Sequence, residues 1–264
     1  MKNIVFFGDS FAAHGLDATA HTQGPTRNTD LISYVDIVAQ AQQARPIYMG
    51  FSGASWWYSY KQLQQWINSN RNMWYDTEAV VMCLTDEGRP KISNTEDLLS
   101  FDRNDGLRRS HYNVQAFTKE FDQWAYRYFL KEAARLFRGK KVILLPCFAD
   151  VTWLSREMHR YFATSTVSLC SIAHSEFVAS DKIRNVNDIV KYLSRHGDSR
   201  ANHLSRHNNQ VLAQDIIDKL NNYTPGAFML NIPSYERGNN FFQHEYDAAQ
   251  TMYQQLTVNR LDSR

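Results

Sequence analysis

The feature that most constrains the fold of this chain is the segment at residues 3–13, N-I-V-F-F-G-D-S-F-A-A. Residues 4–7 form a short run rich in β-branched and aromatic side chains, which is typical of a strand buried on both faces of a parallel sheet. Gly8 permits a sharp exit from the strand, and Asp9 or Ser10 can cap a helix that follows directly. The sequence therefore predicts a serine hydroxyl at the carboxyl end of a central strand, where open α/β sheets bind their ligands.

A second segment of comparable character lies far along the chain, at residues 201–205, A-N-H-L-S. It precedes a predicted helix at residues 208–221. A nucleophilic serine needs a base to accept its proton, and His203 is the histidine of this segment. We therefore expect Ser10 and His203 to meet in the folded protein.

Predicted strands alternate with predicted helices through most of the chain. Strands are expected at residues 4–7, 46–51, 78–84, 141–146 and 166–172, and helices at residues 31–43, 57–68, 113–137, 188–193 and 208–221. Thr29 or Asp30 is expected to cap the first helix, and residues 150–165 are expected to form an irregular lid. This alternation favours βαβ units and therefore an α/β fold with a parallel sheet.

The length of 264 residues and the apolar fraction of 43% suit one main domain with a sizeable core and a smaller addition. Residues 1–225 are expected to form the main domain. Residues 226–264 follow Pro225 and contain one helix-like piece at residues 246–256, so they are interpreted as a C-terminal appendage that can serve as an oligomerisation arm.

Composition argues against several classes of partner and compartment. The net charge of +2 combines 29 basic with 27 acidic residues, which is too balanced to indicate a nucleic-acid partner. Cys83, Cys147 and Cys170 all lie in apolar segments and are expected to be buried free thiols in a reducing compartment. The apolar runs are too short to span a bilayer and no secretory signal precedes Gly8, so we expect synthesis in the cytoplasm without membrane insertion. Incorporation into a virus particle remains an alternative destination.

Two clusters of residues suggest a function at first, but a structural interpretation is preferred for both. His196, His203 and His207 lie close in sequence, but no carboxylate or cysteine has the spacing that would complete a metal site, so no metal is expected. The aromatic residues at positions 56, 57, 58 and 60 can form a wall that stacks on a sugar or an acyl chain. More often such a cluster is the packed face of a helix, which is the interpretation preferred here.

Three short segments occur in a recognisable order along residues 3–222. They read Gly8-Asp9-Ser10, Ser52-Gly53-Ala54-Ser55 and His203-Leu204-Ser205. Together they resemble conserved blocks of the SGNH (GDSL-type) serine hydrolases, a family of esterases, lipases and carbohydrate deacetylases. The resemblance implies a three-layer α/β/α fold with a mainly parallel, flavodoxin-like central sheet and no cofactor. It also implies that Ser10 is the nucleophile, that His203 is the base, and that the Gly53 N–H helps to bind the oxyanion.

The chain departs from the pattern of that family at two positions. Asp86, after Thr85, stands where the family has an oxyanion-binding asparagine, and an ionised carboxylate would repel a developing oxyanion. Either Asp86 is protonated, Thr85 or another group donates instead, or the protein is a poor catalyst. Arg200 stands where the family has its acidic triad residue, and Asp198 is the nearest carboxylate. We therefore expect Asp198 to orient His203.

The resemblance implies hydrolysis of a carboxylic ester, an O-acyl or O-acetyl group on a carbohydrate or another small molecule, through a Ser-His-Asp acyl-enzyme mechanism. The alternative is a catalytically weak or inactive module of the same fold that binds a ligand or builds a homo-oligomer or larger, virion-like assembly. Asp86 and Arg200 favour this alternative. A nucleotide-binding protein is disfavoured because the chain lacks both the Gly-x-Gly-x-x-Gly and the P-loop patterns.

Overall fold

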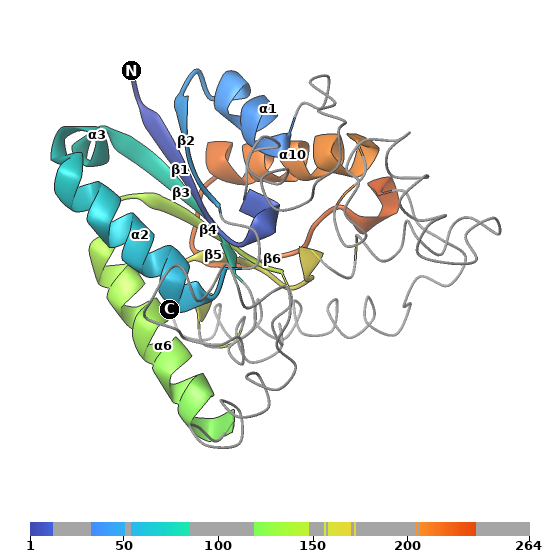
Figure 1. Cartoon of the computed structure of the whole chain (residues 1–264). Coiled ribbons are helices and arrows are strands. Elements are labelled where there is room, and N and C mark those ends of the chain that lie inside the picture. The colour runs from blue at the N-terminus through green and yellow to red at the C-terminus, as the bar shows by residue number, and fades with distance from the viewer. Residues whose placement is uncertain are drawn as a thin grey trace, which may run out of the picture.

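The computed structural model of the chain describes residues 1–12, 33–50, 54–84, 119–147, 158–169 and 206–235 and the single positions 156, 172 and 204 (Figure 1). The strands of this part are β1 (Asn3–Gly8), β2 (Arg45–Gly50), β3 (Thr77–Leu84), β4 (Lys141–Pro146), β5 (Ala163–Ser165) and β6 (Gly226–Phe228). They form one six-stranded sheet in the order β2-β1-β3-β4-β5-β6, and every pair of neighbours is parallel. The predicted α/β fold with a parallel sheet is confirmed.

Helices cover both faces of this sheet (Figure 1). The helices are α1 (Tyr34–Ala41), α2 (Trp56–Ser69), α3 (Arg71–Tyr75), α6 (Lys119–Leu136) and α10 (Arg206–Asn221), with the short 3-10 helices η1 (Ser10–Ala12) and η3 (Ile232–Ser234). Helices α1 and α10 pack on one face, and α2, α3 and α6 pack on the other. The architecture is therefore a three-layer α/β/α arrangement.

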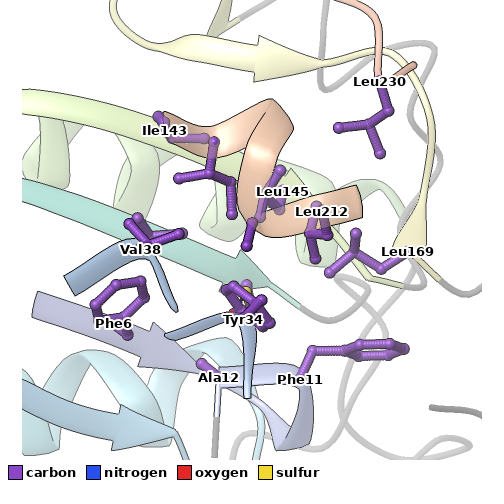
Figure 2. Packing of buried hydrophobic residues seen from close by; sticks show 14 of the residues in the cluster. Phe6, Phe11, Ala12, Tyr34, Val38, Ile143, Leu145, Leu169, Leu212 and Leu230 are labelled. Atoms are coloured by element: carbon purple, nitrogen blue, oxygen red, sulfur yellow. The ribbon is translucent and has the colours of Figure 1, made fainter. Parts of the chain in front are cut away.

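Strand β1 shows why the sheet is buried on both faces. Ile4 and Phe6 belong to the hydrophobic cluster under α1 and α10, and Val5 and Phe7 belong to the cluster under α2 and α6. This alternation follows from the two-residue period of a strand, and a strand covered on both sides must be apolar at every position. Figure 2 shows part of the first cluster, in which Phe6 lies beside Val38 of α1. The apolar run that the sequence presents is thus explained by its central place.

The aromatic residues at the start of α2 divide between core and surface. Trp56 is buried and stacks on Phe129 of α6 with ring centroids 4.9 Å apart. Trp57, Tyr58 and Tyr60 are half-buried. The preferred interpretation of this cluster as a packed helix face is confirmed for Trp56.

Two local predictions are wrong. The fifth strand is Ala163–Ser165, at the end of the expected lid, and not residues 166–172. Ser165 ends the strand because its hydroxyl donates to Val167 O at 2.8 Å and accepts from Val167 N at 3.1 Å, which turns the backbone locally. The cap of α1 is Ser33, whose hydroxyl accepts from Val35 N at 3.1 Å, and not Thr29 or Asp30.

The sheet extends past the expected domain limit at residue 225. Strand β6 pairs in parallel with β5, and the residues that follow it pack on α10. Asp215 of α10 accepts hydrogen bonds from Asn231 N and from Tyr235 Oη, each at 2.9 Å. Residues 226–228 therefore belong to the sheet, Asn231 and Tyr235 bond to α10, and the remainder of the expected appendage lies outside the described residues.

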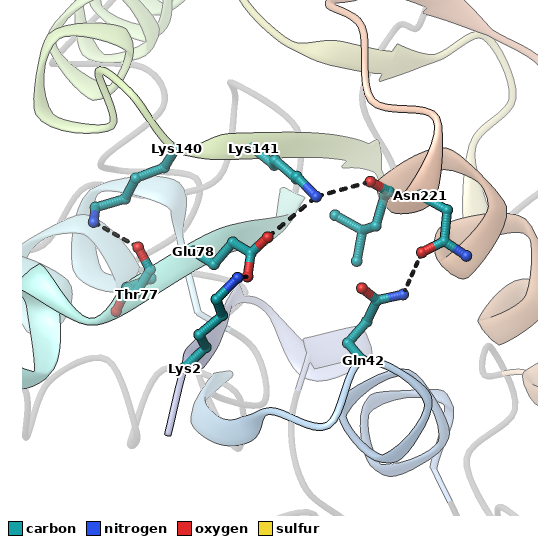
Figure 3. A network of polar contacts seen from close by, with 8 residues as sticks. Lys2, Gln42, Thr77, Glu78, Lys140, Lys141 and Asn221 are labelled. Carbon is teal, nitrogen blue, oxygen red and sulfur yellow. Dashed lines mark hydrogen bonds and ion pairs between the residues drawn. The ribbon is translucent and has the colours of Figure 1, made fainter.

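A network of charged and polar groups joins the elements at the amino edge of the sheet (Figure 3). Glu78, near the start of β3, pairs with Lys2 at 2.7 Å and with Lys141 at 3.2 Å. Lys141 also donates to Leu220 O at 3.1 Å, where the last carbonyls of α10 attract a cation. Lys140 donates to Thr77 O at 2.7 Å. These contacts hold the amino ends of β1, β3 and β4 and the end of α10 together.

Glu78→Gln is expected to lower the free energy of unfolding near neutral pH by about 1 kcal/mol, because the two ion pairs are partly exposed. The hydrogen bond from Lys2, with a weaker contribution from Lys141, holds the pKa of Glu78 below its ordinary value of 4.5. The stabilisation is therefore present above that value and is lost as the pH falls through the lowered pKa of the folded state. Urea unfolding of both proteins at about pH 7 and about pH 2 checks this. A difference that persists unchanged at acid pH would contradict it.

Candidate functional site

The carboxyl ends of β1 and β3 form the point at which the chain connections diverge. The chain leaves β1 for the edge strand β2 and returns to β3 on the other side of β1. Open α/β sheets bind their ligands at such a switch point, because the two connections leave room between them. Ser10 begins η1 two residues beyond the end of β1, so the predicted nucleophile follows the strand that borders this point.

The turn that leads to Ser10 is unusually tight. Gly8 has φ +138°, and a Cβ built at this position would lie 1.8 Å from Cys83 O. The same Cys83 carbonyl accepts a hydrogen bond from Asp9 N at 2.9 Å. A glycine is required here because the end of β1 turns directly against the backbone of β3.

Asp9 stabilises the turn after Gly8 by accepting two hydrogen bonds. Its buried carboxylate accepts from Phe11 N through Oδ1 at 3.0 Å, and its carbonyl accepts from Ala12 N at 3.0 Å. An aspartate that bonds to the backbone two residues ahead is a common way to hold a tight turn. These bonds join the residues on either side of Ser10, so they fix the backbone of Ser10.

Helix α2 begins three residues after Gly53 and makes a hydrogen bond to the turn at Gly8. Ser59 donates from Oγ to Gly8 O at 2.9 Å, and Ser55 caps the helix by accepting from Tyr58 N at 3.2 Å. Both serines are buried. Sequence reasoning did not assign a role to Ser59, although a small polar residue among the aromatic residues of α2 is the signal that could have drawn attention to it.

The start of α10 is tied to the start of α1. Asn209 donates from Nδ2 to Leu204 O at 3.2 Å and accepts at Oδ1 from Tyr34 N at 3.3 Å. Leu204 directly follows His203 and belongs to the same hydrophobic cluster as Phe11, which directly follows Ser10. The chain neighbours of the predicted nucleophile and the predicted base therefore share one cluster.

Most of the predicted site residues themselves lie outside the described residues. This holds for Gly53, Thr85, Asp86, Asp198 and His203, and for Ser10 the structure describes the backbone. Their assignments as triad and oxyanion-hole members stay predictions. The chain neighbours Ala54, Leu84 and Leu204 are all buried, so the described segments lead into these positions from the packed core.

Two buried thiols lie beneath the turn. Cys83 and Cys147 are free and fully buried, as expected, and Cys170 lies outside the described residues. Burial raises the pKa of Cys147, and its neighbours Cys83 and Asp9 raise it further. Tyr34 Oη lies 3.0 Å from Cys83 Sγ, and burial raises the pKa of Tyr34 as well. A buried thiol with a raised pKa is a poor nucleophile, so Cys147 is not an alternative to Ser10.

The fold and the site together define an α/β protein with a candidate ligand site at the carboxyl edge of a parallel sheet. No protein-family model matches the chain, and the comparisons with curated proteins and with solved structures find no match either. Within the described residues, no group of three histidine, cysteine or acidic side chains is placed to hold a metal ion. The helices of this part include none with the length and apolar character that crossing a membrane requires.

Proposed function

We propose that the protein is a serine hydrolase that cleaves a carboxylic ester, an O-acyl or O-acetyl group on a carbohydrate or another small molecule. The observation that carries this proposal is the backbone at Gly8 and Asp9, which holds Ser10 in a tight turn at the switch point of the sheet. A nucleophile held in a sharp turn at the end of a strand is exposed to a ligand and close to backbone N–H donors. The resemblance of the sequence to SGNH hydrolases supports the same reaction.

In the proposed mechanism, Ser10 Oγ attacks the ester carbonyl while His203 Nε2 takes the hydroxyl proton. Asp198 accepts a hydrogen bond from Nδ1 and stabilises the imidazolium. The tetrahedral intermediate collapses to an acyl-enzyme, and His203 returns the proton to the departing alcohol. Water then attacks the acyl-enzyme with His203 as base, which releases the acid and restores Ser10.

The developing oxyanion requires donors. The backbone N–H groups of Ser10 and Gly53 are the proposed pair, and Thr85 or a protonated Asp86 supplies the third. Losing one such donor costs about 2.7–4 kcal/mol of transition-state stabilisation in a known hydrolase. An ionised Asp86 would therefore make a slow enzyme.

The free thiols support a proposal for the cellular compartment of the protein. Cys83 and Cys147 are free, which supports a reducing compartment such as the cytoplasm. The proposed partner is a small-molecule or carbohydrate ester, and self-association into a homo-oligomer or a larger, virion-like assembly is compatible with the same site.

The second candidate function is a binding or structural module in which catalysis has been lost. Asp86 and Arg200 favour it, because they replace an oxyanion donor and a triad acid. A fluorophosphonate probe separates the two functions, since it reacts with an activated serine and not with an ordinary one. The hydrolase is expected to be labelled, with the adduct on the peptide that contains Ser10. Absence of label after long exposure, or equal label in heat-denatured protein, would favour the module.

A further inference from the structure

Asn209 uses both polar atoms of its side-chain amide to connect two segments. Nδ2 donates to Leu204 O at 3.2 Å, and Oδ1 accepts from Tyr34 N at 3.3 Å. Leu204 follows His203 in the chain, and Tyr34 is the first residue of α1. A single side chain in the first turn of α10 therefore ties the segment of the predicted base to a second helix.

Tyr34 extends this connection from α10 toward the turn that precedes Ser10. Its Oη lies 3.0 Å from Cys83 Sγ, and Cys83 O accepts from Asp9 N at 2.9 Å, one residue before Ser10. Tyr34, Cys83 and Asp9 are all buried, so water cannot replace a bond that one of them loses. Figure 2 shows the ring of Tyr34 enclosed by the cluster that also contains Phe11.

We propose that Asn209 is a positioning residue that holds the His203 segment at the distance from Ser10 that proton transfer requires. It acts through Leu204 on one side and through Tyr34 on the other, and it touches no substrate. The catalytic consequence rests on the proposed function. Because displacing a catalytic group by about 1 Å can cost 10²-fold in rate, a lost tether at this place has a measurable effect.

Asn209→Asp is the most informative variant. A carboxylate has the size of the amide and still accepts from Tyr34 N, but it has no proton to donate to Leu204 O. The added negative charge lies in the first turn of α10, where it interacts favourably with the helix dipole. The variant should therefore fold, while it loses the bond to Leu204 O and places a carboxylate oxygen against that carbonyl.

Asn222→Asp provides the matched control. Asn222 follows the other end of α10 and makes the same kind of bond, from Nδ2 to Asp218 O at 3.3 Å, on an exposed surface. It undergoes the same chemical change at the end of the helix that faces away from the site. Asn209→Ala, which loses both bonds without adding charge, replaces Asn209→Asp if the aspartate variant does not fold.

The measured quantity is the second-order rate constant for labelling of Ser10 by a fluorophosphonate, together with kcat and KM for p-nitrophenyl acetate. We expect Asn209→Asp to lower the labelling rate and kcat by about 10–10²-fold with KM unchanged, and Asn222→Asp to react like the wild type. Hydrogen exchange should also become faster in a peptide that contains Leu204. A labelling rate equal to that of the wild type, or a loss confined to KM, would overturn the positioning role.

The wild-type control separates this inference from the proposed function. Wild-type protein that is not labelled at Ser10 overturns the proposed hydrolase, and the positioning role with it. Labelled wild-type protein combined with an equally reactive Asn209→Asp variant overturns the positioning role alone and leaves the hydrolase standing.

Discussion

Gly8→Ala is expected to prevent the protein from folding, with a loss of more than about 4 kcal/mol in the free energy of unfolding. The new Cβ would lie 1.8 Å from Cys83 O and 2.6 Å from Cys83 C, both of which are backbone atoms. The carbonyl cannot move aside without losing the hydrogen bond from Asp9 N and disturbing the pairing of β1 with β3. The backbone angle of φ +138° adds strain for any residue with a side chain.

Gly139→Ala is the control for this variant. Gly139 also has a positive φ, +82°, but a Cβ at that position meets nothing within 4 Å. Its replacement should cost only the backbone strain, about 1–2 kcal/mol. Circular dichroism shows whether each variant folds, and urea unfolding measures the loss in free energy for a variant that does. Similar losses for the two glycines would show that the close approach of β1 to β3 at Gly8 is not what requires a glycine.

Ser10→Ala is expected to lower kcat for p-nitrophenyl acetate by about 10⁴-fold or more, because the acyl-enzyme of the proposed mechanism forms on the Ser10 hydroxyl. His203→Ala should cost a similar factor, since an unactivated serine hydroxyl is a weak nucleophile. The double variant should be no slower than either single variant, because the two residues act as one unit. Steady-state and single-turnover assays of the purified proteins provide the measurement.

Unchanged turnover in Ser10→Ala would show that the hydrolysis comes from another residue or from a contaminant. Additive losses in the double variant would show that Ser10 and His203 act separately, which contradicts the proposed mechanism. The melting temperature of each variant serves as the control for folding.

The longer strands β1 to β4 could be predicted closely from the sequence, and the short strands β5 and β6 could not. Strands β1, β3 and β4 are buried on both faces, so their apolar runs mark them directly, whereas the edge strand β2 keeps Arg45 and Tyr48 exposed. Strands β5 and β6 have three residues each, which is too short for a periodic pattern. Residues 166–172 looked like a strand because they are rich in apolar residues, but the hydroxyl of Ser165 bonds to the backbone of Val167 and ends β5 first.

The same distinction applies to the candidate site. The place of Ser10 follows from local sequence, because a buried strand that ends in Gly8 and Asp9 must deliver the next residue to the edge of the sheet. The role of Asn209 could not be predicted in this way. Its partner Tyr34 is 175 residues away in the chain, and the two side chains carry no local signal of that contact. Contacts of this kind depend on how α1 and α10 pack, which single-sequence reasoning does not supply.

The proposed hydrolase requires Ser10 and His203 to meet at the carboxyl edge of the sheet. The distance between Ser10 Oγ and His203 Nε2 in a crystal structure tests it most directly. We expect a separation of about 2.6–3.2 Å, with a carboxylate on the Nδ1 side of the imidazole. A separation greater than about 6 Å, which a single water molecule cannot bridge, would contradict it.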